Sequence, residues 1–112
     1  MSVITGPGLA VRAKFFRGLA DPSRLALLYA LRTGEKTVSM LSDEIGRSHS
    51  NVSNHLACLK DCGLVSNRQE WRHVHYRIVD ERVLALLTLA DEVVADNAQR
   101  IADCVNYRPG GA

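Results

Sequence analysis

The stretch TVSMLSDEIGRSHSNVSNHLACLKDCGLV, residues 37–65, contains two short helical patterns separated by a tight turn. The first pattern starts after Thr37, a suitable N-cap, and is closed by Gly46. The second runs from about His49 to Cys62, with apolar residues at spacings of four and three, and Gly63 follows it. Two short helices joined by a glycine-containing turn are typical of a helix-turn-helix. This stretch therefore predicts the fold.

Two more helices are predicted before this stretch. After a start that we expect to be mobile (residues 1–8), apolar residues from Leu9 to Ala20 recur at helical spacing. The next helix has Asp21 as its N-cap and Pro22 at its first position, where the missing N–H of proline costs nothing. Its apolar face ends near Gly34.

A β-hairpin and a long helix are predicted after it. Residues from Leu64, and again residues 73–79, alternate in polarity as strands do, with a tip near residues 69–72. Asp80 then caps a final helix, and its apolar stripe runs from Val83 to Ile101. We expect residues 105–112 to be a mobile tail. The whole is one mainly α-helical domain (1–112) with a β-hairpin wing: a winged helix-turn-helix with an extra helix at each end.

The composition limits the class of protein. It is 46% hydrophobic and 23% charged, which is typical of an ordinary globular domain. The sequence contains no apolar run long enough for a membrane span and no secretion signal at its start, so we expect a cytoplasmic protein without a membrane partner. It also contains no nucleophile–base pair and no phosphate-binding loop, so we do not expect an enzyme.

Charge is distributed unevenly along the chain. Residues 47–77 carry a net charge of +3 and all four histidines. Residues 78–112 carry a net charge of −3, and the whole chain carries +2. The central segment could therefore meet a polyanion. The alternative is ordinary surface charge.

The predicted helix from His49 opens with short polar side chains. Helix interiors disfavour Ser and Asn, because these side chains compete for backbone hydrogen bonds. At a helix N-terminus, however, they suit base edges and phosphates in a major groove. The predicted DNA contacts are Arg47, Ser48, His49, Ser50, Asn51, Ser53, Asn54 and Lys60 here, and Arg68, Arg72 and His73 at the hairpin tip. The alternative is a solvated polar helix followed by a charged turn. His55, close to the apolar face, is expected to be structural.

Cys58, Cys62 and Cys104 are the three cysteines. Two cysteines four residues apart on a helix have Cβ atoms roughly 5–6 Å apart, which suits two thiolates on one ion. Three thiolates without an imidazole would favour a soft ion over zinc, which usually takes four ligands. The alternatives are cysteines that pack as small hydrophobic residues, or a reversible thiol switch.

The sequence resembles the ArsR/SmtB family of metalloregulatory repressors over nearly its whole length. The matching stretches are LADPSRL at residues 19–25, SNVSNHL at 50–56, residues 59–65 and VHYRI at 74–78. The resemblance implies a homodimer built on the first and last helices. It also implies that the metal-free dimer binds operator DNA and releases it when an inducer binds.

Within the family, residues 51–65 are similar to the CmtR-type cadmium/lead sensors. That similarity implies Cd(II) or Pb(II) as inducer, with Zn(II) as a weaker one, bound by Cys58, Cys62 and Cys104. The family's paired-cysteine motif before the recognition helix is absent, since residues 37–41 stand there. Val93 stands where a zinc-type histidine would follow Asp91, and the wing tip lacks the usual glycine.

The main hypothesis is therefore a repressor of metal efflux or resistance genes. One rival keeps the DNA binding but takes arsenite or thiol oxidation as the signal. The other is a protein-interaction module, with a long final helix that pairs with a partner and a winged domain that does not bind DNA.

Overall fold

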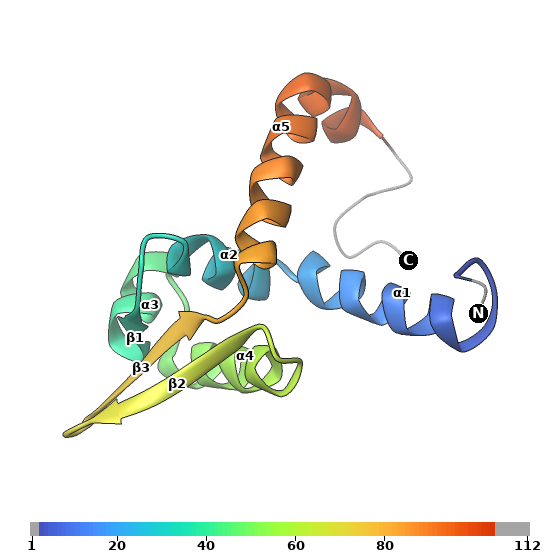
Figure 1. The fold of residues 1–112 in the computed structure, drawn as a ribbon. Coiled ribbons are helices and arrows are strands. Elements are labelled where there is room, and N and C mark those ends of the chain that lie inside the picture. Colours follow the sequence, from blue (N-terminus) through green and yellow to red (C-terminus); the bar gives the residue numbers. More distant parts are fainter. Residues whose placement is uncertain (1–2, 105–112) are drawn as a thin grey trace. The chain divides into compact units, whose positions relative to one another are not determined.

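The computed structural model describes residues 3–104 (Figure 1). The chain divides into two compact units, one up to Asp80 and one from Glu81. The first unit contains α1 (Gly6–Ala20), α2 (Pro22–Leu31), β1 (Lys36–Thr37), α3 (Val38–Ile45), α4 (His49–Asp61), β2 (Val65–Glu70) and β3 (His73–Ile78), and the second contains α5 (Glu81–Asp103). The predicted winged helix-turn-helix order is confirmed. No helix among the described residues is long and apolar enough to cross a membrane.

The core of the first unit forms where α2, α3 and α4 pack together. Each helix contributes fully buried leucines: Leu27 and Leu28 of α2, Leu41 of α3 and Leu56 of α4. Val52, one turn before Leu56, is also fully buried, so a single apolar stripe of α4 faces the core. The opposite face of α4 remains exposed to solvent.

Side chains fix where the helices begin. The Asp21 carboxylate accepts the backbone N–H of Arg24 at 3.0 Å, and Thr37 accepts that of Met40 at 3.2 Å. Ser48 accepts the N–H of Asn51 at 3.1 Å and so caps α4. The hydrogen bond from the Arg24 N–H holds the pKa of Asp21 below its usual range. The predicted caps Asp21 and Thr37 are confirmed.

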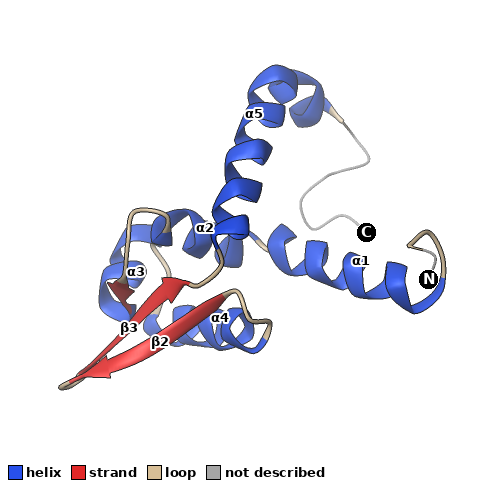
Figure 2. Cartoon of the chain, viewed as in Figure 1, coloured by secondary structure: helices blue, strands red, loops and turns tan. Residues whose placement is uncertain are grey.

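The strands form one antiparallel sheet in the order β1–β3–β2 (Figure 2, red). The hairpin was predicted, but β1 was not, since two residues are too few to show a period. Pairing continues as far as Glu70 opposite His73, so the tip is only Trp71 and Arg72, shorter than predicted.

Two helices differ in detail from the prediction. α1 begins at Gly6 rather than near Leu9, because Pro7 occupies one of its first positions, where proline is tolerated. α5 is interrupted at Asn97, whose φ of −129° is not helical. The predicted mobile tail, residues 105–112, lies outside the described residues.

Candidate DNA-reading helix and cysteine pocket

The turn between α3 and α4 is held by Ser42, whose side chain is buried. Its hydroxyl donates to the carbonyl of Arg47 at 2.5 Å, and its own carbonyl accepts the N–H groups of Gly46 and Arg47. Gly46 has a φ of 70°, the left-handed conformation that lets the chain leave α3 in one step. The angle between α3 and α4 is therefore fixed at the point where a helix-turn-helix needs it.

The exposed face of α4 carries several of the predicted DNA contacts. His49, Ser50, Ser53 and Asn54 are exposed, as is Arg47 in the preceding turn. Each has donors or acceptors free to meet a ligand from solvent. The positive end of the helix dipole adds to the attraction for phosphate.

Ser48 and Asn51 differ from the other predicted contacts at the start of α4. Ser48 caps the helix, and its hydroxyl also lies 3.3 Å from that of Ser50. Asn51 is half-buried, and its buried Oδ1 has no hydrogen-bond partner within residues 3–104. Ser48 thus helps to place α4, whereas Asn51 keeps an unused acceptor.

The hairpin lies beside the C-terminal half of α4, where Lys60 donates to the side chain of Asn67 at 3.3 Å. Arg68, a predicted DNA contact, is bound by Glu35 and Glu70, with its Nη1 2.7 Å from the Glu70 carboxylate. Arg68 lowers the pKa of both glutamates, mainly through these hydrogen bonds. Its charge is therefore already neutralised by two carboxylates.

The two histidines of β3 differ from each other in exposure. His73 is exposed, as is the neighbouring Arg72. His75 is half-buried, with its Nδ1 3.7 Å from the Glu35 carboxylate. The difference arises because β1 and the residue before it lie along β3 and cover His75.

Replacing Glu35 with glutamine should free Arg68 to contact DNA phosphate. We expect tighter binding of duplex DNA at low salt, and a steeper dependence of log affinity on log salt by roughly one unit. Fluorescence anisotropy over a salt series measures both. Glu44→Gln is the matched control, because Glu44 pairs with Lys36 and its loss removes the same charge. Equal slopes for the two variants would contradict the assignment of Arg68 as a neutralised phosphate contact.

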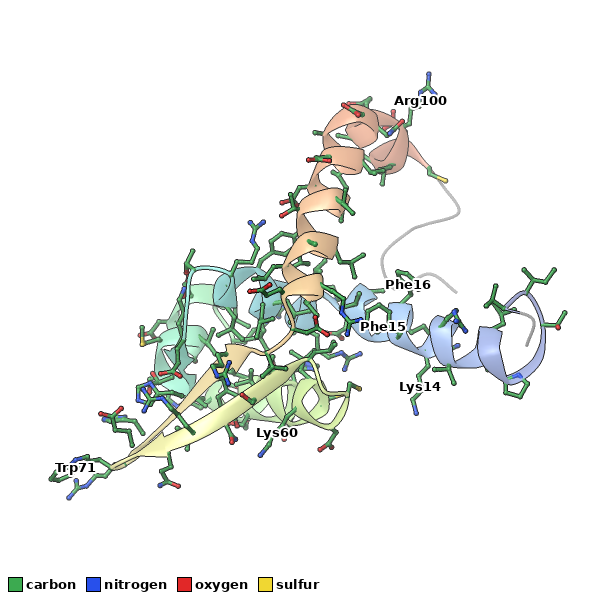
Figure 3. The ribbon with its side chains drawn as sticks, viewed as in Figure 1. Lys14, Phe15, Phe16, Lys60, Trp71 and Arg100 are labelled. Atoms are coloured by element: carbon green, nitrogen blue, oxygen red, sulfur yellow. The ribbon has the colours of Figure 1, made fainter. Side chains whose placement is uncertain are left out.

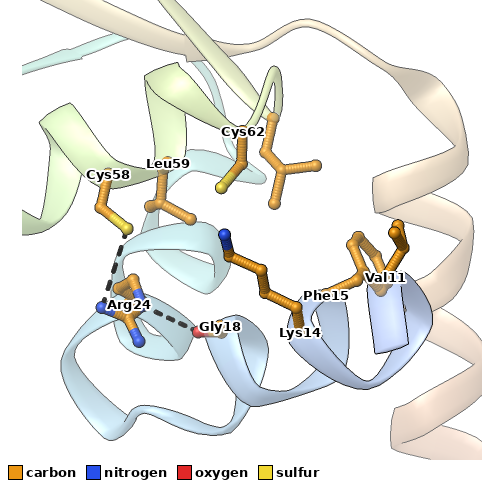
Figure 4. Close-up of a pocket in the computed structure, with 9 residues that line it drawn as sticks. Val11, Lys14, Phe15, Gly18, Arg24, Cys58, Leu59 and Cys62 are labelled. Atoms are coloured by element: carbon orange, nitrogen blue, oxygen red, sulfur yellow. Dashed lines mark hydrogen bonds between the residues drawn. The ribbon is translucent and has the colours of Figure 1, made fainter. Parts of the chain in front are cut away.

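Cys58 and Cys62 lie at the edge of a pocket of about 310 Å³. Figure 4 shows their side chains pointing from the end of α4 toward α1. The lining residues are Val11, Lys14, Phe15, Gly18, Arg24, Cys58, Leu59, Cys62 and Leu64. Both thiols are free and exposed, so an ion from solvent can reach them. The lining combines two thiols with two cations, which would offset the charge of the thiolates.

Arg24, on α2, contacts both α1 and α4 at this pocket. Its Nε donates to the Gly18 carbonyl at the end of α1 at 2.9 Å, and its Nη1 lies 3.5 Å from His55 Nδ1 and 3.9 Å from Cys58 Sγ. His55 Nδ1 is also 3.9 Å from the Asp21 carboxylate, which agrees with its predicted structural role. Sequence reasoning missed Arg24, because contacts between residues about thirty positions apart leave no local pattern.

Cys104 follows α5 in the second unit and is half-buried. In that unit it borders a shallow pocket with Val93, Asn97, Arg100 and Ile101. Among residues 3–104, no group of three or more His, Cys, Asp or Glu side chains is close enough to hold a metal ion. The three-cysteine site therefore stays a prediction.

The three-stranded sheet, the helix-turn-helix and the polar α4 define a winged helix-turn-helix DNA-binding protein. Residues 21–67 match the family described as "Bacterial regulatory protein, arsR family". The probable mercury resistance operon repressor of Streptomyces lividans is 45% identical over 98 residues, which span 88% of this chain and 78% of that protein. The transcriptional regulator CmtR of Mycobacterium bovis is 42% identical over 82 residues, 73% of this chain and 70% of that protein.

Solved structures of similar regulators superpose on this chain. A homodimeric winged helix-turn-helix DNA-binding domain from Mycobacterium bovis superposes with a TM-score of 0.69 at 35% identity, over 81% of this chain and 83% of that one. The antimony-specific transcriptional repressor AntR superposes with a TM-score of 0.74 at 33% identity, over 88% of this chain and 90% of that one. The chain belongs to the ArsR family. It is a transcriptional repressor and not an enzyme.

Proposed function

We propose that the chain is a homodimeric repressor that binds operator DNA in the metal-free state and releases it when Cd(II) or Pb(II) binds. Release would derepress genes for metal efflux or resistance. The observation that carries the proposal is the position of Cys58 and Cys62 at the C-terminal end of α4, the helix whose other end carries the polar residues. An ion bound there acts on the backbone of the DNA-reading helix itself.

The metal ligands we propose are Cys58, Cys62 and Cys104. Thiolates favour soft ions such as cadmium and lead, and zinc would bind more weakly to three of them. Support comes from the pair of exposed thiols in one pocket and from the similarity to CmtR, a regulator 42% identical to this chain. Cys104 completes the set from its own subunit or from the partner.

The coupling we propose runs through Arg24. A metal-bound Cys58 thiolate shares its charge with the ion, which changes its attraction for the Arg24 guanidinium. Arg24 also contacts His55, in the turn of α4 that follows the DNA-reading residues. A coupling free energy of about 1–3 kcal/mol, or roughly 5- to 150-fold in operator affinity, is typical of such switches.

A cadmium titration followed by ultraviolet absorption tests the site. The wild-type chain should develop a sulfur-to-metal band that saturates at one ion per site and weakens in Cys58→Ser, Cys62→Ser and Cys104→Ser. Ala57→Ser is the matched control, since it places the same hydroxyl at an exposed neighbouring position of α4. A missing band, or one that is unchanged in Cys58→Ser, would rule out the proposed ligands.

A second inducer class is favoured by one specific observation. AntR, whose structure resembles this one, is an antimony-specific repressor. Trivalent metalloids bind thiols, so arsenite or antimonite could use Cys58 and Cys62. Operator release by arsenite but not by cadmium would select this alternative, and release by peroxide would select thiol oxidation.

The proposed dimer is supported by exposed apolar side chains on the terminal helices. In α5, Leu89, Val93, Val94 and Ile101 are between 44% and 58% exposed. In α1, Leu9, Val11 and Phe16 are between 46% and 68% exposed. Faces this apolar are typical of surfaces that a second copy covers.

Replacing Val93 with aspartate should disrupt the dimer, because it buries a charge in an apolar interface. We expect light scattering to report the mass of a monomer. Operator binding should weaken strongly, because a monomer contacts only one of the two half-sites. Ala95→Asp is the matched control: Ala95 is also exposed on α5 but lies away from the apolar stripe. A Val93→Asp protein that remains dimeric would exclude this part of α5 from the interface.

A further inference from the structure

The tip of the hairpin consists of Trp71 and Arg72, since Glu70 pairs with His73. Two-residue hairpin loops favour residues that tolerate a positive φ, above all glycine and asparagine. Trp71 has a φ of 60°, which is a genuine outlier for a bulky side chain. The backbone of this turn therefore does not account for a tryptophan, and would be less strained with glycine.

Packing within the chain does not account for it either. Trp71 is 90% exposed, and Figure 3 shows it at the far end of the hairpin. It is the one tryptophan of the sequence. A large apolar side chain held in water, on a backbone it does not suit, is typical of a contact made with a partner.

The surroundings of Trp71 indicate which partner. Arg72 and His73 follow it and are exposed. Within residues 3–104, Arg72 has no hydrogen bond or ion pair, in contrast to Arg68, which two glutamates neutralise. The tip thus combines an indole with an available cation. Sugars and phosphates of a nucleic acid groove offer the matching apolar edges and negative charge.

The hairpin is also placed to reach DNA held by α4. In Figure 1, β2 starts after the C-terminal end of α4 and the tip extends past the end at which α4 begins. The turn is braced, because the Gln69 side-chain amide donates to the Trp71 carbonyl at 3.2 Å. The pairing of Arg68 with Glu35 ties the same hairpin to the residue before β1. The indole is therefore presented by a fixed turn.

We propose that Trp71 is a DNA contact of the wing, whose indole packs against the sugar edges of the minor groove beside the half-site contacted by α4. Arg72 binds the adjacent phosphate. This inference rests on the proposed operator binding, but it needs no metal and none of the cysteines. Apolar side chains are a recurring means of minor-groove contact.

Intrinsic fluorescence tests the proposal directly, because all tryptophan emission comes from residue 71. The metal-free full chain is titrated with fluorescein-labelled duplex from upstream of its own gene, and anisotropy records binding. In parallel, tryptophan emission and its quenching by acrylamide are recorded with unlabelled duplex. We expect emission to change and acrylamide quenching to fall as the duplex binds.

Variants of the hairpin tip distinguish the loss of a DNA contact from a loss of stability. Trp71→Gly suits the φ of 60°, so its unfolding midpoint should equal or exceed that of the wild type, while operator affinity falls about tenfold, or roughly 1.4 kcal/mol. Trp71→Phe should keep most of the operator affinity. Arg72→Gln should reduce the slope of log affinity against log salt concentration by roughly one unit. Binding with unchanged tryptophan emission and quenching, or with full affinity in Trp71→Gly, would overturn the proposal. If no duplex bound at all, the premise of operator binding would fail with it, whatever the response to cadmium.

Discussion

Replacing Leu56 with alanine should lower the free energy of unfolding by about 2–5 kcal/mol. Leu56 is fully buried on the inner face of α4, where it meets the core that α2 and α3 contribute. Its loss leaves a cavity that rigid helices can only partly fill. Since a domain of this size has a total stability of roughly 5–15 kcal/mol, this is a large fraction. Urea denaturation of the metal-free protein at a fixed concentration measures the change.

The control for this prediction is Ala57→Ser, at the next position of the same helix. Ala57 is exposed, so its substitution should change the stability by no more than about 0.5 kcal/mol. A loss of less than 1 kcal/mol for Leu56→Ala would mean that α4 is not anchored as described. The rigid placement of the DNA-reading face would then lose its physical basis.

The second large effect is expected on operator affinity, from Asn54→Ala. Asn54 is exposed on the outer face of α4, and its side-chain amide can pair with the edge of a base. Loss of one good bidentate contact costs about 1–3 kcal/mol, which is roughly ten- to a hundredfold in affinity. Binding to unrelated DNA should hardly change, because phosphate contacts supply it. Competition assays with specific and unrelated duplexes measure the two affinities separately.

Gln99→Ala provides the matched control, since it removes an exposed side-chain amide from α5 rather than α4. It should leave both affinities unchanged. If Asn54→Ala weakened specific and unrelated duplexes equally, Asn54 would be a phosphate contact. If it weakened neither, the outer face of α4 would not be the reading face.

Most of the fold could be predicted from the sequence because its signals are local. Asp21 followed by Pro22, Thr37 and the glycines after α3 and α4 mark helix ends within a few residues, and the structure uses Asp21, Thr37 and Gly46 in these roles. The two residues of β1 could not be predicted, since their strand exists only through pairing with β3. Local signals thus give the order of elements but not the third strand.

The candidate site was predictable only in part. The polar opening of α4 and the spacing of Cys58 and Cys62 are visible as patterns, and the structure brings these two cysteines to one pocket. The neutralisation of Arg68 by Glu35 is not visible, because it joins residues far apart in the sequence. The same is true of Arg24, whose contacts with Gly18 and Cys58 depend on how α1, α2 and α4 pack.

One titration tests whether α4 both reads DNA and senses metal. Anisotropy of labelled operator duplex is measured at fixed salt with the wild-type chain, first metal-free and then with one equivalent of cadmium per site. We expect tight, salt-dependent binding by the metal-free protein and an affinity lower by roughly 5- to 150-fold with cadmium. We also expect Cys58→Ser to bind the duplex but no longer to respond to the ion. Equal affinity of the wild-type protein with and without bound cadmium would contradict the shared role of α4.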